Sequence, residues 1–314
     1  MLKCKPAQRH RLKRAAHTVN KPLMNATIVV ITTMLLAFPA VAEHAQQPTI
    51  AIVIDDMGNN LENGKGLIDL PYPLTLSFLP ERRHTLALID RARKKNKEIM
   101  LHSPMQNSLG IKLGKGGLTE NMSEMQIKQT LRKSFIAIPH MVGLNNHMGS
   151  RLTTQSKVMS WVMETVSQHP FFFLDSRTSA NSVAAKTAAL HSIPNITRDI
   201  FLDHHPTRKF VQAQFIKLLE TAREKGTAIA IAHPHKVTLD YLRWALSKLD
   251  EKGISIASAS AIWQIQNPGK SMDRVFESRS QPSRIAQNQP RNADKLQPVR
   301  LKTPAITTST QTAL

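Results

Sequence analysis

The chain has 314 residues, of which 42 are Lys or Arg and 22 are Asp or Glu, so its formal net charge is +20. This length is enough to bury a large core in one α/β domain or in two smaller ones. The single cysteine, Cys4, excludes an internal disulfide and a cysteine-based zinc or redox site.

The positive charge is concentrated towards the two ends of the chain. Residues 1–42 contain seven basic residues and no acidic one, and residues 268–314 contain eight basic and three acidic residues. The middle of the chain keeps 27 basic and 19 acidic residues, which is a moderate excess. This distribution argues against a nucleic-acid partner and favours an exported domain that works near an anionic cell envelope.

The first 42 residues have the pattern of a secretory signal. A basic stretch is followed by the apolar run ATIVVITTMLLAFPAVA, which ends in small residues before Glu43. The run is near the lower length limit for a membrane span, and Pro39 interrupts it. We therefore predict a signal peptide over 1–42, with a retained membrane signal anchor as the alternative, and a periplasmic location for the rest.

Composition divides the remaining chain into three parts. Residues 43–49 read as a short polar linker, and residues 50–267 contain the periodic apolar segments. From Pro268 onward the sequence is rich in Ser, Gln, Pro, Asn, Thr and Arg, a composition that buries too little apolar surface to fold. We predict one folded domain over 50–267 and a basic disordered tail over 268–314.

Short apolar runs alternate with helical patterns through the predicted domain. Ser123, with Gln126 three residues later, predicts a helix start, and residues 207–225 and 239–252 predict helices that each end at a glycine. Strands that alternate with helices over roughly 220 residues predict a deformed parallel (β/α) barrel of seven or eight strands. The strand-like runs are 50–54, 74–78, 98–101, 142–144, 171–174, 200–202, 228–232 and 254–257.

Polar and titratable side chains follow six of these eight runs. In a parallel barrel the carboxyl ends of all strands lie on one face, where such enzymes have their active sites. A turn requires only residues such as Asn, Gly or Asp, so repeated His and Asp clusters indicate a site. These residues are Asp55 and Asp56; His102 and Ser103; Asn145, Asn146, His147 and Ser150; Asp175, Ser176 and Arg177; Asp203, His204 and His205; and His233 and His235.

Each of these clusters also has a purely structural interpretation. The Asp55–Asp56 pair could cap a helix, although a cap needs only one carboxylate. Asp175 and Arg177 could form an internal ion pair, and the histidines before Pro206 could belong to a surface turn. The face that these residues share therefore indicates a site, and no single residue does so alone.

The segments IDDMG, LHSPM, NNHMGS, FFLDSRTS, DIFLD and IAHPH together resemble the divergent polysaccharide deacetylase family, a branch of the polysaccharide deacetylase superfamily. In that superfamily the first Asp of an Asp-Asp pair is the general base and the second binds a metal ion. A histidine after strand three also binds the metal, and a late histidine is the general acid. The resemblance therefore implies Asp55 as base, Asp56 and His102 as metal ligands, and His233 as acid.

The sequence departs from the superfamily pattern at the third metal ligand. Gln106 stands where the His-Ser/Thr-x-x-His motif has its second histidine, and an amide oxygen binds zinc less well than imidazole does. His147 lies at the next strand end, and we predict it as the third ligand ahead of Gln106. The Arg-Pro-Pro-x-Gly motif is likewise replaced, by Asn-Asn-His-Met-Gly-Ser.

These observations predict a periplasmic, metal-dependent deacetylase of an N-acetylated glycan. The expected partner is an envelope polysaccharide or peptidoglycan, and the expected cofactor is a divalent metal ion, zinc first. The alternatives are a non-catalytic glycan-binding or envelope-assembly factor on the same barrel, and a hydrolase of an ester or another carbon–nitrogen bond. The residues predicted to bind substrate or to support the site are Asn146, Ser150, Asp175, Arg177 and Asp203.

Overall fold

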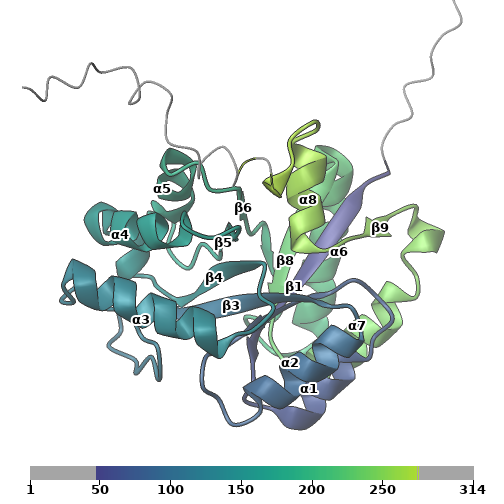
Figure 1. Cartoon of the computed structure of the whole chain (residues 1–314). Coiled ribbons are helices and arrows are strands. Elements are labelled where there is room, and N and C mark those ends of the chain that lie inside the picture. Colours follow the sequence, from purple (N-terminus) through teal and green to yellow (C-terminus); the bar gives the residue numbers. More distant parts are fainter. Residues whose placement is uncertain (1–46, 274, 276–314) are drawn as a thin grey trace, which may run out of the picture. The chain divides into compact units, whose positions relative to one another are not determined.

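The computed structural model describes residues 47–273 and 275, and Figure 1 shows their arrangement. The predicted signal segment, 1–42, and the predicted tail beyond residue 275 lie outside the described residues. The strands are β1 Thr49–Met57, β2 Thr75–Phe78, β3 Glu98–Met105, β4 Gly143–Met148, β5 Phe172–Asp175, β6 Asn195–Thr197, β7 Ile200–Phe201, β8 Thr227–Ala232 and β9 Ser255–Ile256. The α-helices are α1 Leu61–Ile68, α2 Thr85–Lys94, α3 Glu124–Ala137, α4 Ser156–Val166, α5 Ala184–Leu190, α6 Arg208–Lys225, α7 Lys236–Leu246 and α8 Ala259–Gln266.

The strands form one parallel sheet in the order β6-β5-β4-β3-β2-β1-β8-β7, with β9 paired to the start of β1. Among the described residues no ladder joins β6 to β7, so the barrel is incomplete on that side. The predicted deformed parallel barrel is confirmed, and all eight predicted strands are present. The additional strand is β6, whose sequence Asn-Ile-Thr has only one apolar residue and so carried no strand pattern.

All three predicted helix boundaries are present, and Gly253 is left-handed, with φ of 63°, at the third of them. Ser123 and Gln126 form a capping box at the start of α3, and Gly226 ends α6 in the left-handed conformation, with φ of 82°. The helix predicted over 239–252 is different. Its α-helical part is α7, and a 3₁₀ turn over Asp250–Lys252 follows, an arrangement that keeps Leu249 buried in the core.

Alternation along the strands produces two separate cores. In β1, Ile50, Ile52 and Ile54 pack outward among the helices, whereas Ala51 and Val53 face the interior of the sheet. Helix α8 packs against β1 and β8 and completes the interior core, which Met272 and Val275 also contact. Two residues of the segment predicted as a tail therefore pack on the domain. The interior core is Ala51, Val53, Met100, Phe172, Leu174, Ile196, Ile229, Ile231, Ala259, Ile262 and Trp263.

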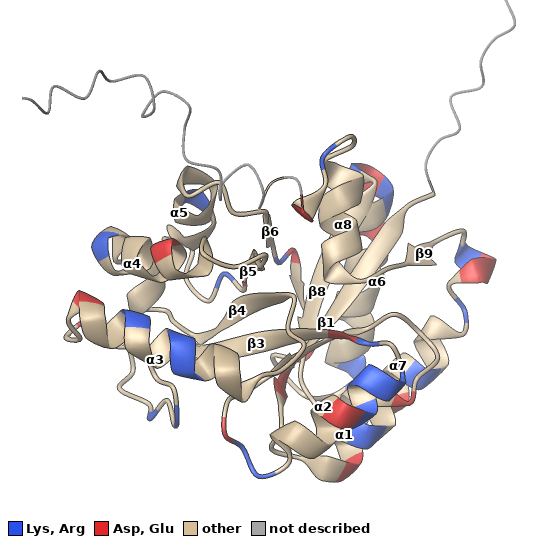
Figure 2. Cartoon of the chain, in the orientation of Figure 1, with Lys and Arg blue, Asp and Glu red and all other residues tan. Residues whose placement is uncertain are grey.

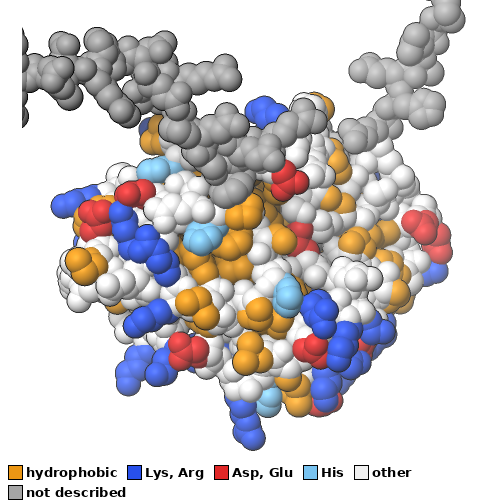
Figure 3. Space-filling view, in the orientation of Figure 1, with side chains coloured by type: hydrophobic (Ala, Val, Ile, Leu, Met, Phe, Trp, Pro, Cys, Tyr) orange, Lys and Arg blue, Asp and Glu red, His pale blue; other side chains and the backbone are white. Residues whose placement is uncertain are grey.

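Lys, Arg, Asp and Glu residues lie mostly on the helices and loops, and the strands contain few of them (Figure 2). On the face drawn in Figure 3, Lys and Arg lie towards the margins, whereas hydrophobic and uncharged side chains occupy the middle. Within the described ranges, no helix has the length and apolar character that crossing a membrane requires.

Candidate active site

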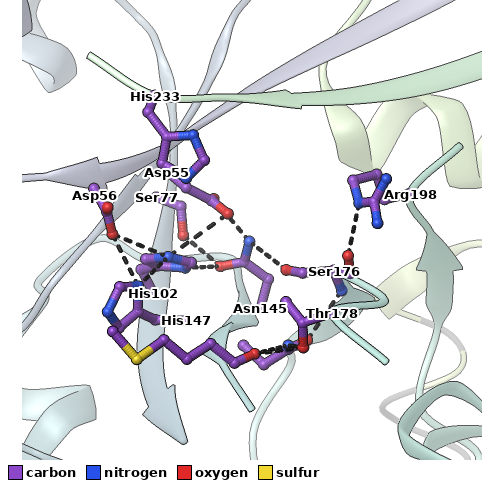
Figure 4. A network of polar contacts seen from close by, with 12 residues as sticks. Asp55, Asp56, Ser77, His102, Asn145, His147, Ser176, Thr178, Arg198 and His233 are labelled. Carbon is purple, nitrogen blue, oxygen red and sulfur yellow. Dashed lines mark hydrogen bonds and ion pairs between the residues drawn. The ribbon is translucent and has the colours of Figure 1, made fainter. Parts of the chain in front are cut away.

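The interior face of the strands continues into polar residues at their carboxyl ends. Asp55, His102 and His233 each lie two residues after a side chain of the interior core, so alternation places them on the same face. Asn145 is the β4 residue directly opposite His102 in the β3–β4 ladder, and it shares that face. Side chains that are far apart in the sequence thereby meet in one cluster (Figure 4).

Asp56 reaches this cluster because β1 is irregular at that point. Regular alternation would turn its side chain to the opposite side from Asp55. However, the register with β2 shifts between Ile54 and Met57, and Asp56 has a φ of 56°. A left-handed backbone is uncommon outside glycine, and Asp and Asn tolerate it best. This irregularity directs the Asp56 carboxylate toward the two histidines.

Asp56, His102 and His147 bring three potential metal-ligand atoms together. Oδ1 of Asp56 lies 2.9 Å from Nδ1 of His147 and 3.3 Å from Nε2 of His102. The two imidazole nitrogens are 3.1 Å apart. Gln106 does not take part, because its Oε1 accepts a hydrogen bond from the backbone N–H of Glu120.

The donor set of this cluster fits a divalent metal ion. Oδ1 of Asp56 is buried and, despite its short contacts, makes no well-aligned hydrogen bond within the described part of the chain. Ligand atoms about 2.1 Å from a tetrahedral zinc ion lie roughly 3.4 Å apart, close to the three distances here. A buried carboxylate oxygen that faces two imidazole nitrogens requires a compensating cation or proton, and one divalent ion satisfies all three groups.

Asn145 connects this cluster to Asp55. Its Nδ2 donates to Oδ1 of Asp55 at 2.8 Å and to Oγ of Ser176 at 3.2 Å. Its Oδ1 accepts from Oγ of Ser77 at 2.6 Å and lies 2.8 Å from Nδ1 of His102. From the sequence we assigned no role to Asn145 or Ser77. Both residues could be found from the alternation of side chains along a strand, which places each of them on the interior face.

The two adjacent carboxylates have opposite electrostatic environments. Burial raises the pKa of Asp55, and the nearby charges of His102 and His233 only partly offset this effect. Burial also opposes ionisation of Asp56, but the imidazoles of His102 and His147 outweigh it and hold the Asp56 pKa well below its usual range. Asp56 is therefore suited to bind a cation and Asp55 to accept a proton.

Asp203, which the sequence predicts to support the site, contacts His233. Asp203 is buried and accepts hydrogen bonds from the backbone N–H of His233 at 2.7 Å, from the Nδ1 side of its ring at 2.9 Å, and from Oγ1 of Thr238 at 2.8 Å. Burial lowers the pKa of His233, but Asp203 outweighs it and raises that pKa to about 9. The ring of Phe201 stacks on His233, and exposed His235 completes a second group of potential ligands with Asp203 and His233.

Asn146 and Asp175, both predicted to support the site, lie outside the cluster. Each directly follows a residue of the interior face, so alternation along the strand turns its side chain to the opposite face. Oδ1 of Asn146 accepts from the backbone N–H of Ser176, and Asp175 accepts from the N–H of Arg177 and from Oγ of Ser182. These buried side chains brace the loops after β4 and β5.

Ser150 and Arg177 lie in the loops around the cluster. Oγ of Ser150 accepts from the backbone N–H of Ser108, and the side chain of Arg177 is exposed. Arg198, which we did not single out from the sequence, donates to the carbonyl oxygens of Ser176 at 2.7 Å and Arg177 at 3.0 Å. Burial lowers its pKa, and the charge of Asp55 acts against that shift. Arg198 follows β6, the strand that had no sequence pattern.

Residues 52–263 match the family model described as divergent polysaccharide deacetylase, and this segment contains every residue of the cluster. The protein belongs to the divergent polysaccharide deacetylase family. An uncharacterized protein of Haemophilus influenzae is 32% identical over 246 residues, which are 78% of this chain and 88% of that protein. The uncharacterized protein YibQ of Escherichia coli is 32% identical over 213 residues, which are 68% of this chain and 66% of YibQ.

One solved structure supports the fold. The crystal structure of an uncharacterized protein from Agrobacterium tumefaciens has a TM-score of 0.66 and 24% sequence identity, and the match covers 69% of this chain and 89% of that one. At this identity the likeness shows the fold alone.

Proposed function

We propose that this protein is a metal-dependent deacetylase that removes acetyl groups from an N-acetylated glycan. The observation that carries the proposal is the convergence of Asp56, His102 and His147 beside the buried carboxylate of Asp55. They lie at the carboxyl ends of parallel barrel strands, where barrel enzymes have their active sites. Membership of a polysaccharide deacetylase family supports the choice of an acetylated glycan as substrate.

Asp56, His102 and His147 are the residues that would hold the metal ion. Zinc suits one carboxylate and two imidazole ligands, and three protein ligands leave a position open for chemistry. When bound, such an ion supplies Lewis-acid chemistry, because it polarises a carbonyl group and lowers the pKa of water.

Asp55 is the proposed general base. Oδ1 of Asp55 accepts a hydrogen bond from Asn145. Oδ2 of Asp55 lies 3.6 Å from Nε2 of His102, on the side of the ligand cluster. Burial raises the affinity of this carboxylate for a proton, so Asp55 can take a proton from the attacking water better than an exposed aspartate can.

His233 is the proposed general acid. With a pKa of about 9, its imidazole carries two protons at neutral pH. Asp203 holds the Nδ1 proton, which leaves the Nε2 proton for the departing amine nitrogen. Asp55 and His233 are close enough for the charge of each to shift the pKa of the other, as expected for a base and an acid that act on one bond.

We also propose that the protein acts in the periplasm on an envelope polysaccharide or on peptidoglycan. The predicted signal sequence over 1–42 supports this location. The moderate excess of basic residues in the middle of the chain suits an anionic envelope surface.

The test is acetate release from N-acetylated chitin fragments, peptidoglycan and envelope polysaccharides, each with added Zn²⁺, Co²⁺ or Mn²⁺. We expect release from at least one substrate and its loss in the Asp55→Asn variant. Absence of release from every substrate with every metal ion would remove the enzymatic proposal. Glycan binding without release would support the non-catalytic alternative.

A further inference from the structure

We propose that Asn145 is a positioning residue, which fixes the tautomer of His102 and the orientation of Asp55 through one side-chain amide. The catalytic consequence of this role rests on the proposed function, whereas the role itself follows from the hydrogen bonds of Asn145. Asn145 is buried, and so are the four residues that its side chain contacts, Asp55, Ser77, His102 and Ser176. Figure 4 shows these side chains pointing toward one another.

The contacts of Asn145 fix which way its amide points. A carboxylate oxygen only accepts hydrogen bonds, so the NH₂ group of Asn145 must face Oδ1 of Asp55, at 2.8 Å. The carbonyl oxygen then faces β2 and β3, where Oγ of Ser77 donates to it at 2.6 Å. The second NH₂ hydrogen is directed to Oγ of Ser176. Reversing the amide would place its carbonyl oxygen against Oδ1 of Asp55, and two acceptors cannot share a hydrogen bond, whereas the hydroxyl groups of Ser77 and Ser176 can donate or accept.

This orientation determines the tautomer of neutral His102. The carbonyl oxygen of Asn145 can only accept, so Nδ1 of His102, 2.8 Å away, must carry the proton. Nε2 is then left with its lone pair, and it faces Oδ1 of Asp56 and Nδ1 of His147. A histidine binds a metal ion through such an unprotonated nitrogen, and the group bonded to its other nitrogen selects the tautomer.

The same amide orients the proposed base. Since the Asn145 NH₂ group holds Oδ1 of Asp55, only Oδ2 remains directed toward His102 and the ligand cluster. All four hydrogen-bonding positions of the amide are in use, two as donor and two as acceptor. Loss of Asn145 should therefore affect metal binding and the base together.

The experiment compares the wild type with Asn145→Leu, which has a similar size and no hydrogen-bonding group. Asn107→Ala is the control: Asn107 is also a buried asparagine, and its side chain bonds to Leu109, Ile111 and Met148 and not to His102 or Asp55. The first readout is the His102 tautomer in metal-free protein, measured by long-range ¹H–¹⁵N correlation at a pH where the ring is neutral. The second is the zinc dissociation constant from calorimetry.

We expect the Nδ1–H tautomer of His102 in the wild type and in Asn107→Ala, and the Nε2–H tautomer to become populated in Asn145→Leu. Zinc affinity should fall about 10- to 100-fold in Asn145→Leu, as for loss of other partners of metal-binding histidines. An Nε2–H tautomer in the wild type would overturn the inference, and this measurement does not depend on the folding of any variant. An unchanged tautomer and unchanged affinity in Asn145→Leu would also overturn it. Failure of the wild type to bind zinc would instead defeat the proposed function, while the tautomer result would still decide the role of Asn145.

Discussion

Oδ1 of Asp56 lies 2.9 Å from Nδ1 of His147, although their strands, β1 and β4, are separated by β2 and β3. In a flat sheet, strands three positions apart are separated by roughly 14 Å, because neighbouring strands are about 4.8 Å apart. The contact therefore requires the strong curvature of the barrel together with the irregular backbone at Asp56. The proposed metal centre is thus a consequence of the fold and not of one local motif.

The third metal ligand can be tested by paired substitutions. We expect His147→Ala to lose most zinc binding, because it removes one of three ligand atoms. Gln106→Ala should keep it, since the Gln106 side chain bonds to the backbone of Glu120. Zinc content after dialysis, measured by mass spectrometry of the metal, distinguishes the two. The opposite pattern would show that the amide and not His147 is the ligand.

Asp55→Asn should separate metal binding from turnover. The substitution keeps the size of the side chain and one oxygen that can accept from Asn145, but removes the carboxylate that would accept a proton. We expect zinc to stay bound and kcat to fall by about 10²- to 10⁴-fold, the usual contribution of general base catalysis. Steady-state kinetics measure the loss of kcat, and the zinc content of the purified variant shows whether the metal stays bound. A variant with near wild-type kcat would exclude Asp55 as the base.

The alkaline limit of activity should reflect His233. Its pKa is raised to about 9, so the imidazole stays protonated at neutral pH and loses its proton only as the pH rises through that value. Activity should therefore decline above about pH 9. Asp203→Asn removes the charge that raises this pKa and should move the decline to lower pH, whereas Thr238→Ala, which keeps the charge, should move it less. An alkaline limit that is the same in all three proteins would argue against His233 as the acid.

Asp175 should matter for stability and not for metal binding. Its carboxylate is buried and accepts hydrogen bonds from Ser182 and from the backbone of Arg177. Asp175→Ala leaves these donors without their acceptor, which should lower the free energy of unfolding by about 1–3 kcal/mol. Urea unfolding measures this loss, and zinc titration of the same variant should match the wild type. Weakened zinc binding would place Asp175 in the site after all.

Much of this fold is visible in the sequence because eight of the nine strands in the described part of the chain contain a short apolar run. The exception, β6, has one apolar side chain and is held in the sheet by its ladder with β5. The residues of the cluster are also visible as polar strand ends. Which of these residues join the cluster and which only support the loops depends on the face of the strand to which each side chain points. This alternation distinguishes Asn145 from Asn146 and Ser176 from Asp175.

The alternation of side chains along β1 does not place Asp56 in the cluster. Alternation from Asp55 predicts that its side chain points away, and only the positive φ and the register shift bring it back. Such a backbone conformation costs of order 1–3 kcal/mol and persists where the surrounding structure enforces it, often at functional sites. The resemblance to a deacetylase family supplied the role of Asp56, and the irregular backbone supplies the geometry for it.

A zinc-edge anomalous diffraction measurement on crystals of the protein grown with zinc would locate the proposed metal centre directly. We expect one strong peak among Oδ1 of Asp56, Nε2 of His102 and Nδ1 of His147, and its absence in His147→Ala crystals. A peak only at the second group, Asp203, His233 and His235, or no peak at either group, would contradict the proposal.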